Sequence, residues 1–469
     1  MISAKPAIPA IRRPSNPLQE KPKPPKNAVG TNEPDTAASI IGQTAASEST
    51  SSAFTPPQVE TIRETHLSES MVEGLLFKHL LAVGNDTGRG IALAIAMPPK
   101  PIIEMLAGLK SRQFVYHKDS TAMGDFEYAL TDAGRARAKA YLEECSYVGP
   151  APVTLEDYIK SVEAQSITLE KARQEDLQRA FDGLLINREM FQRLGPAINS
   201  GRGLFLYGFP GNGKTSIAER ITNCFGGHVW IPYAVYTGGE MITFYDPQNH
   251  VVLESDTPKI LKTQATDPRW IQIRRPTIVV GGELTMDSLD LQHNAHTKIT
   301  EPPLQLRSNT GTLVIDDFGR QRMRPIELLN RWIVPLEKRY DFLTLSNGKK
   351  IKVPFDQLII FSTNLEPKDL VDDAFLRRIP YKINVLDPSE EEFRKLFNIM
   401  SPIVNVPLDP QAVDYLIEKH YRSVNRPFRC CQPRDLLLQI KNFAAYQGDV
   451  PVGTNAAFDA ACENYFAVM

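Results

Sequence analysis

A glycine-rich segment near the middle of the chain has the residue types that hold a chain of phosphates. It fits the pattern G-x-x-x-x-G-K-[ST] and, with the residue after it, consists of Gly208, Phe209, Pro210, Gly211, Asn212, Gly213, Lys214, Thr215 and Ser216. Glycines let the backbone wrap around an anion and turn its N–H groups inward at the positive end of a helix. In this pattern the Lys214 amine reaches the outer phosphates and the Thr215 hydroxyl holds Mg²⁺. The segment therefore predicts a site for a phosphorylated ligand with magnesium.

A pair of carboxylates further along the chain supplies the second half of such a site. Asp316 and Asp317 follow the apolar residues 312–315, so they come at the carboxyl end of a predicted buried strand. Doubly wound sheets bind their ligands at that edge. Asp316 is suited to hold the hydration shell of Mg²⁺, and Asp317 to orient and deprotonate an attacking water. Such a pair alone is common, so its meaning depends on the glycine-rich segment upstream.

These residues need a sheet to position them, and the apolar runs predict one. Residues 204–207 predict a short strand directly before the glycine-rich loop, and residues 215–224 predict the helix after it. Further buried strands are expected at residues 277–280, 312–315, 358–364 and 382–385. Together they predict an α/β fold with a doubly wound, parallel, five-stranded sheet.

Two further patterns accompany this predicted core. Residues 342–353 predict a hairpin with an Asn-Gly turn, just before the strand that ends at Asn364. A capping box begins at Ser389, and helical patterns follow it at residues 389–400, 410–421, 433–447 and 456–467. We therefore expect an ATPase-like core over residues 151–386 and a helical lid over residues 387–469.

The residues before the core predict a small separate unit. Residues 61–150 combine three helical patterns, two short strands and a last helix, an order that resembles a winged helix-turn-helix domain. Basic side chains are few on the third helix and on the loop between the strands, so DNA binding and protein docking both stay open. Residues 1–60 are rich in Pro, Ser, Thr and Ala, which predicts a disordered tail, either a tether or a plain solvated segment.

The composition limits the class of protein. The chain has 469 residues, 42% of them hydrophobic, which is enough for two or three domains. A net charge of -2 gives no overall signal for a polyanionic partner, and the odd count of 5 cysteines argues against a disulfide framework. No apolar run is long enough to span a membrane, and the N-terminus lacks the apolar core of a signal peptide. We expect a cytoplasmic protein without membrane insertion.

Residues 229–236 and 241–245, with Gly238 and Gly239 between them, predict a β-hairpin that residues 251–254 and 270–273 could extend. The segment that contains them, residues 233–307, is longer than a simple strand–helix–strand connection needs. We interpret them either as an insertion that faces a substrate or partner, or as a decoration of one family. His293 and His296 lie within this segment, three positions apart. No nearby cysteine completes a metal site, which favours solvated histidines.

The order of these motifs resembles that of the AAA+ ATPases over residues 153–469. The order is the glycine-rich loop, the Asp-Asp strand, the Ser-Thr-Asn strand, Leu-Arg-Arg, and a helical lid with Pro-Arg-Asp-Leu. The hairpin at residues 342–353 is similar to the insert of the pre-sensor-1 hairpin group, which includes MoxR-type ATPases and bacterial enhancer-binding activators. The resemblance implies ATP and Mg²⁺ as cofactors and a homo-oligomeric ring, commonly a hexamer.

The resemblance also implies roles for single residues. The glycine-rich loop would be Walker A and the Asp316–Asp317 pair Walker B. Asn364 would be the sensor-1 residue that helps Asp317 to place the water. Most members carry Asp-Glu where this chain carries Asp-Asp, so fast hydrolysis is in question.

Three arginines complete the implied set. Arg377 or Arg378 would be the arginine finger that reaches the nucleotide of a neighbouring subunit, although either could simply pair with Asp372 or Asp373. Arg434 would be the sensor-2 arginine that reports the nucleotide state to the lid.

The implied function is an ATP-hydrolysing ring that remodels a protein or nucleoprotein partner, with hydrolysis moving the lid and the hairpin. Two alternatives stay open. One is an ATP-gated regulator or loader that binds DNA through residues 61–150. The other is a scaffold that ATP stabilises without being hydrolysed.

Overall fold

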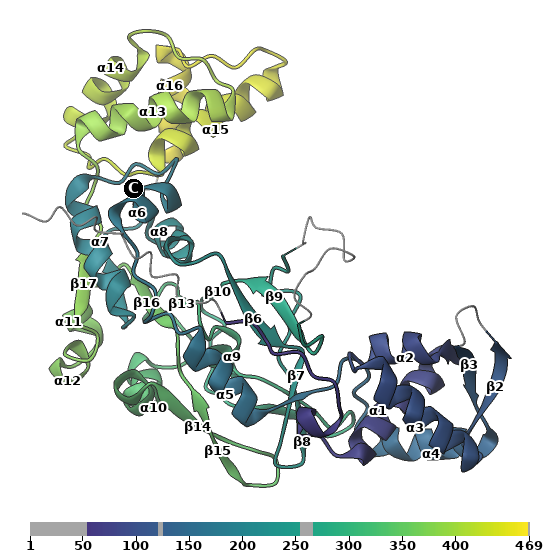
Figure 1. Ribbon diagram of the computed structural model, residues 1–469. Helices are drawn as coiled ribbons and strands as arrows, with labels where there is room; N and C mark the ends of the chain where they lie inside the picture. Colours follow the sequence, from purple (N-terminus) through teal and green to yellow (C-terminus); the bar gives the residue numbers. More distant parts are fainter. Residues whose placement is uncertain (1–53, 121–124, 254–265, 468–469) are drawn as a thin grey trace, which may run out of the picture. The chain divides into compact units, whose positions relative to one another are not determined.

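The computed structural model describes residues 54–120, 125–253 and 266–467 (Figure 1). The predicted tail therefore falls, up to residue 53, outside the described residues. Residues 54–60, which we had assigned to the tail, contact the rest of the chain. The Phe54 ring lies 6.0 Å from the Trp270 ring, and the Pro56 carbonyl accepts a hydrogen bond of 3.4 Å from the Asp267 amide.

The central sheet has five parallel strands, as predicted, in the order β10–β13–β16–β5–β17. Their bounds are β5 Leu204–Tyr207, β10 Thr277–Val280, β13 Thr312–Ile315, β16 Leu358–Thr363 and β17 Tyr381–Asn384. The pairing register sets Tyr207 beside Thr363, and Ile315 beside Phe361. The carboxyl ends of β5, β13 and β16 therefore meet at one edge.

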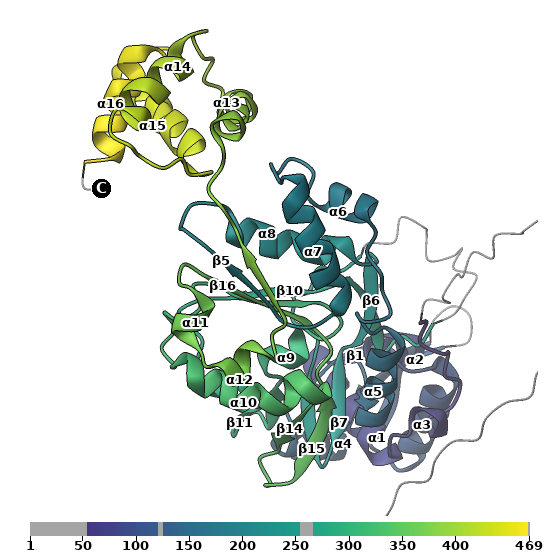
Figure 2. The ribbon, with the colours of Figure 1, turned by 90° about the vertical axis from the view of Figure 1, so that its left-hand side faces the viewer.

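Helices cover both faces of this sheet, which confirms the doubly wound prediction (Figure 2). One face is covered by α6 (Gln174–Ala180), α7 (Arg188–Ser200) and α8 (Lys214–Ile221). The other is covered by α10 (Pro325–Lys338), α11 (Pro367–Leu370) and α12 (Asp373–Leu376). In β5, Leu204 and Leu206 pack on the first face and Phe205 on the second. Since each such buried side chain contributes about 1.5–3 kcal/mol, the alternation fixes the orientation of the strand.

The segment between β5 and β13, together with β4 before it, builds a second sheet, of which the sequence predicted only a hairpin; that hairpin is present as β7 and β8. Its strand order is β11–β12–β8–β7–β4, and β6 pairs with β9 beside it. The bounds are β4 Val153–Thr154, β6 His228–Pro232, β7 Ala234–Thr237, β8 Glu240–Thr243, β9 Trp270–Arg274, β11 Gln292–Asn294 and β12 Ile299–Glu301. The run at residues 229–236 is thus divided at Tyr233 between two sheets.

The predicted hairpin is present as β14 (Tyr340–Thr344) and β15 (Lys350–Pro354). Gly348 in its turn has φ +80°, a conformation that glycine adopts without a steric penalty. The inward side chains of the hairpin share a hydrophobic core with the second sheet and with α5 (Leu155–Ala164). The short helix α9 (Leu304–Arg307) leads back from that sheet to β13.

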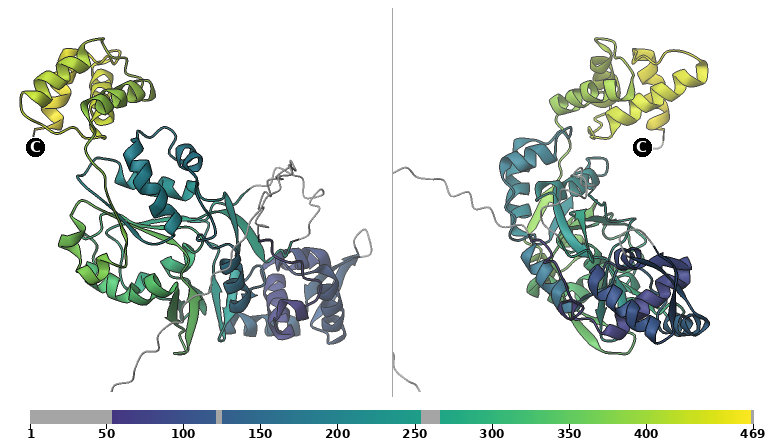
Figure 3. Two further views of the ribbon diagram at one scale, coloured as in Figure 1. Left: turned by 60° about the vertical axis from the view of Figure 1, so that its left-hand side comes forward. Right: turned by 45° about the vertical axis from the view of Figure 1, so that its right-hand side comes forward.

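The C-terminal residues form the predicted helical lid, shown in yellow and yellow-green in Figure 3. The elements are α13 (Glu390–Val404), α14 (Ala412–Leu416), the π-helical turn η6 (Ile417–Arg422), α15 (Gln432–Gln447) and α16 (Asn455–Tyr465). The Ser389 hydroxyl accepts a hydrogen bond from the Glu392 amide, and the Glu392 carboxylate accepts one from the Ser389 amide, which completes the predicted capping box. Phe393, Phe397 and Phe458 anchor a separate core for the lid.

The N-terminal unit has the predicted order of three helices, a hairpin and a last helix. Its elements are η1 (Arg63–Thr65), α1 (Glu69–Val83), β1 (Asn85–Thr87), α2 (Gly88–Ala94), α3 (Pro99–Ser111), β2 (Val115–Ser120), β3 (Phe126–Leu130) and α4 (Asp132–Glu144). Two short helical turns, η3 (Thr222–Cys224) and η5 (Asp287–Leu289), lie later in the chain and outside this unit. We expected two short strands in this unit, but a third, β1, pairs with β3. Its core continues into the second sheet through Ala234 and Met241. The winged helix-turn-helix assignment stays a prediction.

None of the described helices is by itself long and apolar enough to cross a membrane. The pair α2 and α3, bent by 119°, meets that test of length and composition only when taken together.

Candidate functional site

The Lys214 amine lies inside the phosphate loop, residues 208–215, and faces the strand that ends at Asn364. It donates hydrogen bonds to the carbonyls of Gly208 (2.8 Å) and Phe209 (2.9 Å) and to the Asn364 side-chain oxygen (2.7 Å). Gly213 precedes the helix α8 with φ +79°, which turns the loop into the helix without a Cβ in the way. The loop is thus wrapped around a single cation.

The two predicted carboxylates meet this loop from β13. The Thr215 hydroxyl donates a hydrogen bond of 2.9 Å to the Asp316 carboxylate, so the two groups assigned to magnesium are adjacent. The Asn364 amide donates a bond of 3.3 Å to the Asp317 carboxylate. Five predicted residues from three parallel strands and their loops therefore converge at one edge of the sheet.

The electrostatics of the loop are set by Lys214. Burial lowers the pKa of its amine, because desolvation penalises the charged form, and the Asp316 and Asp317 carboxylates oppose this effect. Arg429 in the lid also disfavours the charged form of Lys214. A bound polyanion would relieve this repulsion between the two cations, so the charges suit a phosphate ligand.

The groups present fit a nucleotide with Mg²⁺. Magnesium prefers hard oxygen ligands from one or two carboxylates together with phosphates, and Asp316 and Thr215 offer a carboxylate and a hydroxyl side by side. Gly208 and Gly211 have φ +132° and +85°, values that leave the loop backbone free to surround an anion.

The lid reaches the phosphate loop through residues that the sequence motifs did not indicate. The Arg429 guanidinium lies 4.4 Å from the centroid of the Phe209 ring and forms an ion pair with Asp387. The Asn212 side chain donates a hydrogen bond of 2.7 Å to Asp387 and accepts one of 3.3 Å from the Cys430 amide. The loop and the lid are thus joined by charge and by hydrogen bonds.

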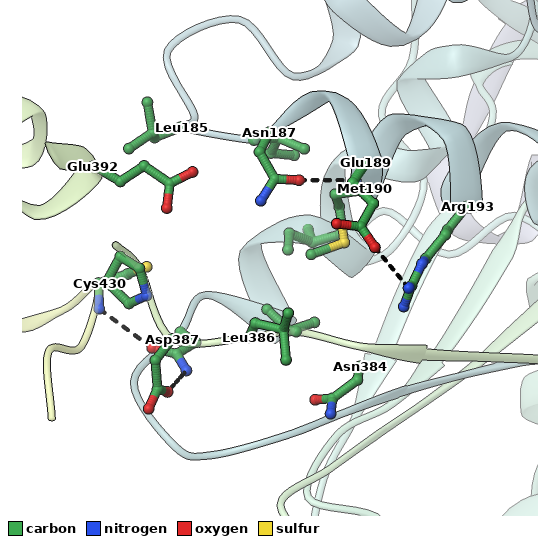
Figure 4. Close-up of a pocket in the computed structure, with 15 residues that line it drawn as sticks. Leu185, Asn187, Glu189, Met190, Arg193, Asn384, Leu386, Asp387, Glu392 and Cys430 are labelled. Atoms are coloured by element: carbon green, nitrogen blue, oxygen red, sulfur yellow. Dashed lines mark hydrogen bonds and ion pairs between the residues drawn. The ribbon is translucent and has the colours of Figure 1, made fainter. Parts of the chain in front are cut away.

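A pocket opens between α7, the end of β17 and the lid (Figure 4). Its lining combines apolar side chains such as Leu185 and Met190 with the amides of Asn187 and Asn384. Asn187 also caps α7 by accepting a hydrogen bond of 2.9 Å from the Met190 amide. Four charged side chains, Glu189, Arg193, Asp387 and Glu392, also line the pocket.

A second groove borders the loop on the side of Asn364. Three of its apolar side chains are largely exposed: Phe209, Leu365 and Leu386 have exposed fractions of 61%, 44% and 58%. These three apolar side chains border the nucleotide-facing edge of the sheet and are exposed to solvent.

The three predicted arginines lie in different environments. Arg434 is exposed and pairs with its neighbour Asp435 at 3.1 Å. Arg378 pairs with Glu337 at 2.6 Å. Arg377 is exposed, and its guanidinium has no hydrogen bond or ion pair with any residue that the structure describes. Of the remaining predicted residues, Pro210 and Ser216 are exposed.

The predicted histidines show no metal geometry. His293 contacts the Thr300 hydroxyl at 2.9 Å, and His296 uses its backbone amide to bond Asn294. In the described part of the chain, no group of three or more His, Cys, Asp or Glu side chains is arranged to hold a metal.

Comparisons with known proteins add little to this geometry. A family model described as a domain of unknown function (DUF8689) matches residues 389–464, which is the lid. No curated protein matches the chain.

Several solved structures are similar to the chain. One is NtrX from Brucella abortus, with 15% identity, a TM-score of 0.39, and coverage of 61% of this chain and 57% of NtrX. Another is a mutant of RuvB from Thermotoga maritima, with 11% identity, a TM-score of 0.34, and coverage of 67% and 73%. The chain thus spans little more than half of the length of NtrX. Similarities at these TM-scores establish neither a family nor an activity.

Proposed function

We propose that this chain is a magnesium-dependent ATPase of the AAA+ type, which acts as a ring oligomer and remodels a protein or nucleoprotein partner. The observation that carries the proposal is the convergence of Lys214, the Thr215–Asp316 pair and the Asp317–Asn364 pair at the carboxyl edge of a parallel sheet. Phosphoryl transfer needs little beyond such positioning and charge compensation.

Each residue of the site has a role in this proposal. Lys214 binds the outer phosphates, and Thr215 and Asp316 hold Mg²⁺. When bound, the metal neutralises charge that develops on the phosphate oxygens. Asp317 accepts the proton of the attacking water, and Asn364 orients that carboxylate. The pocket of Figure 4 takes the base.

The arginines divide between the lid and a second copy of the chain. Arg429 contacts the loop, so we assign the phosphate-sensing role in the lid to Arg429 and not to Arg434. Arg377 is exposed and uncommitted among the described residues, so it is the better candidate for a finger that enters a neighbouring site. The exposed apolar groove beside Asn364 gives the neighbour a surface to cover.

Steady-state ATP turnover by the purified chain tests the proposal and separates it from a scaffold that does not hydrolyse ATP. We expect Asp317→Asn to bind ATP with unchanged affinity but to hydrolyse it at least about 100-fold more slowly, because the base is lost. Arg377→Ala should likewise spare binding and impair turnover, while Arg378→Ala should have the smaller effect. Wild-type protein that binds ATP without turnover would favour the scaffold instead.

The N-terminal unit is proposed to dock a protein partner. Two of the basic side chains near its third helix and its hairpin have partners, because Arg112 pairs with Glu73 and Lys118 donates to Asn85. Its exposed apolar side chains include Leu93, at 79%. DNA binding through residues 61–150 is the competing proposal. A mobility-shift assay of the full chain with duplex DNA decides between them, since phosphate contacts would make binding fall steeply with salt.

A further inference from the structure

The turn that follows β13 holds Asp317 in a left-handed backbone conformation. Its φ is +48°, one of few positive values at non-glycine residues among those that the structure describes. Gly319, two positions later, has φ +105°. Left-handed backbone is disfavoured for residues with a Cβ and persists where surrounding contacts impose it, often at functional sites.

The Gln321 side chain connects the two ends of this turn. Its amide nitrogen donates a hydrogen bond of 2.8 Å to the Asp316 carbonyl, and its oxygen accepts one of 2.8 Å from the Gly319 amide. One side chain therefore satisfies the backbone on both sides of Asp317. Neither hydrogen bond involves the carboxylates of Asp316 and Asp317.

The neighbouring strand fixes the turn from the other side. Phe318 is fully buried, its amide donates a hydrogen bond of 2.7 Å to the Ser362 carbonyl, and its carbonyl accepts one of 2.8 Å from the Thr363 hydroxyl. The residues on both sides of Asp317 are thus tied to the protein, while Asp317 itself is exposed. Among the residues that the structure describes, the one hydrogen-bond partner of its carboxylate is the Asn364 amide, at 3.3 Å.

We propose that Gln321 is a positioning residue that holds the 316–319 turn so that the short carboxylate of Asp317 reaches the water site beside Asn364. The inference rests on the proposed ATPase function. An aspartate is one methylene shorter than the glutamate that the resembled family carries at this position. The left-handed turn compensates for the shorter side chain, because it directs the carboxylate toward the water site. A glutamate at this position would be both longer and less tolerant of positive φ.

The first test is the kinetics of Gln321→Ala. We expect kcat for ATP hydrolysis to fall about 10–100-fold, the range that a displacement of roughly 1 Å costs in a positioned site. KM and the affinity for a fluorescent ATP analogue should stay within twofold of wild type, because the turn does not hold the phosphates. Gln447→Ala, at an exposed glutamine in α15, is the matched control.

The second test uses Asp317→Glu, alone and with Gln321→Ala. In the wild-type turn the longer side chain should lower kcat, and in the released turn of the double variant the additional loss should be smaller, so the two effects are not additive. A general loss of stability would not produce this coupling. Gln321→Met preserves the shape without the hydrogen bonds and should behave as Gln321→Ala does.

Three results overturn the inference. They are unchanged kcat in Gln321→Ala, equal losses of kcat and of ATP affinity, or an Asp317→Glu variant that is faster than wild type. Failure of the underlying function has a different signature, because wild-type protein would then either bind no ATP analogue or bind it without turnover.

Discussion

A buried carboxylate, Glu240, and the Asp316–Asp317 pair differ in how much of their hydrogen-bonding capacity the protein uses. Glu240, at the start of β8, is 6% exposed. One of its oxygens accepts hydrogen bonds from the Ser346 amide (2.6 Å) and hydroxyl (2.7 Å), and the other accepts one from the Thr300 hydroxyl (2.9 Å). Asp316 and Asp317 each accept a single side-chain hydrogen bond from the residues that the structure describes.

The difference separates a structural joint from a ligand site. An ionised carboxylate accepts about four hydrogen bonds. Glu240 uses most of that capacity within the chain, so it joins the turn of the β14–β15 hairpin to the β7–β8 turn. Asn347 adds a bond of 2.9 Å to the Gly238 carbonyl. Asp316 and Asp317 keep most of their capacity, which is what binding of a cation and a water requires.

The same comparison bears on the expected movement of the hairpin. We expected the 347–348 turn to move relative to the ring on hydrolysis. In the structure this turn is held against the second sheet, and a Cβ at Gly238 would come within 2.5 Å of Leu345. Movement of the hairpin would therefore carry the second sheet with it.

The largest effect should come from removing the carboxylate assigned to magnesium. We expect Asp316→Ala to lower kcat for ATP hydrolysis at least about 100-fold, because charge on the phosphate oxygens is then poorly neutralised. Steady-state assays over a series of Mg²⁺ concentrations measure this. Asp449→Ala, at an exposed aspartate of the lid, should have no effect. Full activity of Asp316→Ala would show that Asp316 does not hold the metal.

The opposite pattern is expected at the structural joint. Glu240→Ala removes the acceptor of three hydrogen bonds, two from Ser346 and one from the buried Thr300 hydroxyl, which should reduce the free energy of unfolding by about 1–3 kcal/mol. The affinity for ATP should not change. Denaturant unfolding and nucleotide titration measure the two quantities, and Glu240→Gln, which keeps one acceptor oxygen, should lose less stability. A loss of ATP affinity at constant stability would contradict a purely structural role for Glu240.

A smaller effect is expected where the lid contacts the phosphate loop. Arg429→Ala should weaken ATP binding about tenfold, since one charge-assisted contact is lost. Arg434→Ala, in the Pro-Arg-Asp-Leu motif, is the matched control and should bind ATP as tightly as wild type does. The opposite ranking of the two variants would restore the role that the sequence implied for Arg434.

The smallest effect concerns acid pH. Burial raises the pKa of the Glu240 carboxyl, but the hydrogen bonds from Ser346 and Thr300 outweigh it and leave the pKa below its usual value. A lowered folded-state pKa contributes stability above the unfolded-state pKa, and this is lost as pH falls through the folded-state value. Wild type should therefore lose more stability than Glu240→Gln between pH 7 and strongly acid pH. Parallel losses in the two proteins would show that Glu240 does not contribute.

The sequence predicted the elements that local patterns determine. The strands β5, β13 and β16 are short continuous apolar runs next to recognisable loops, and the Ser389 capping box marks the start of α13 through contacts between near neighbours. The same local patterns brought Lys214 and Asp316 to one edge, because the carboxyl ends of neighbouring parallel strands coincide.

Of the second sheet, only the β7–β8 hairpin was predicted in this way, with its first strand begun too early. The strands of this sheet have two to four residues, too few for a clear alternation, and β12 pairs in parallel with β8 across a long stretch of sequence. Arg429 and Gln321 were missed for a related reason. Arg429 contacts the Phe209 ring and the Asp387 carboxylate, and Gln321 bonds the backbone on both sides of Asp317. No residue spacing signals such contacts. The Pro-Arg-Asp-Leu pattern indicated Arg434 as the sensor-2 arginine, which stays a prediction. In the structure Leu436 and Leu437 pack in the core of the lid, and Arg434 is exposed.

Calorimetric titration of Mg²⁺-ATP into the full chain and into Lys214→Ala tests the central claim most directly. The account predicts saturable binding at one site in the wild-type protein, which disappears in Lys214→Ala while the melting temperature stays unchanged. Equal affinity in the two proteins, or no binding to wild type, would contradict the claim that the phosphate loop and the β13 carboxylates form a nucleotide site.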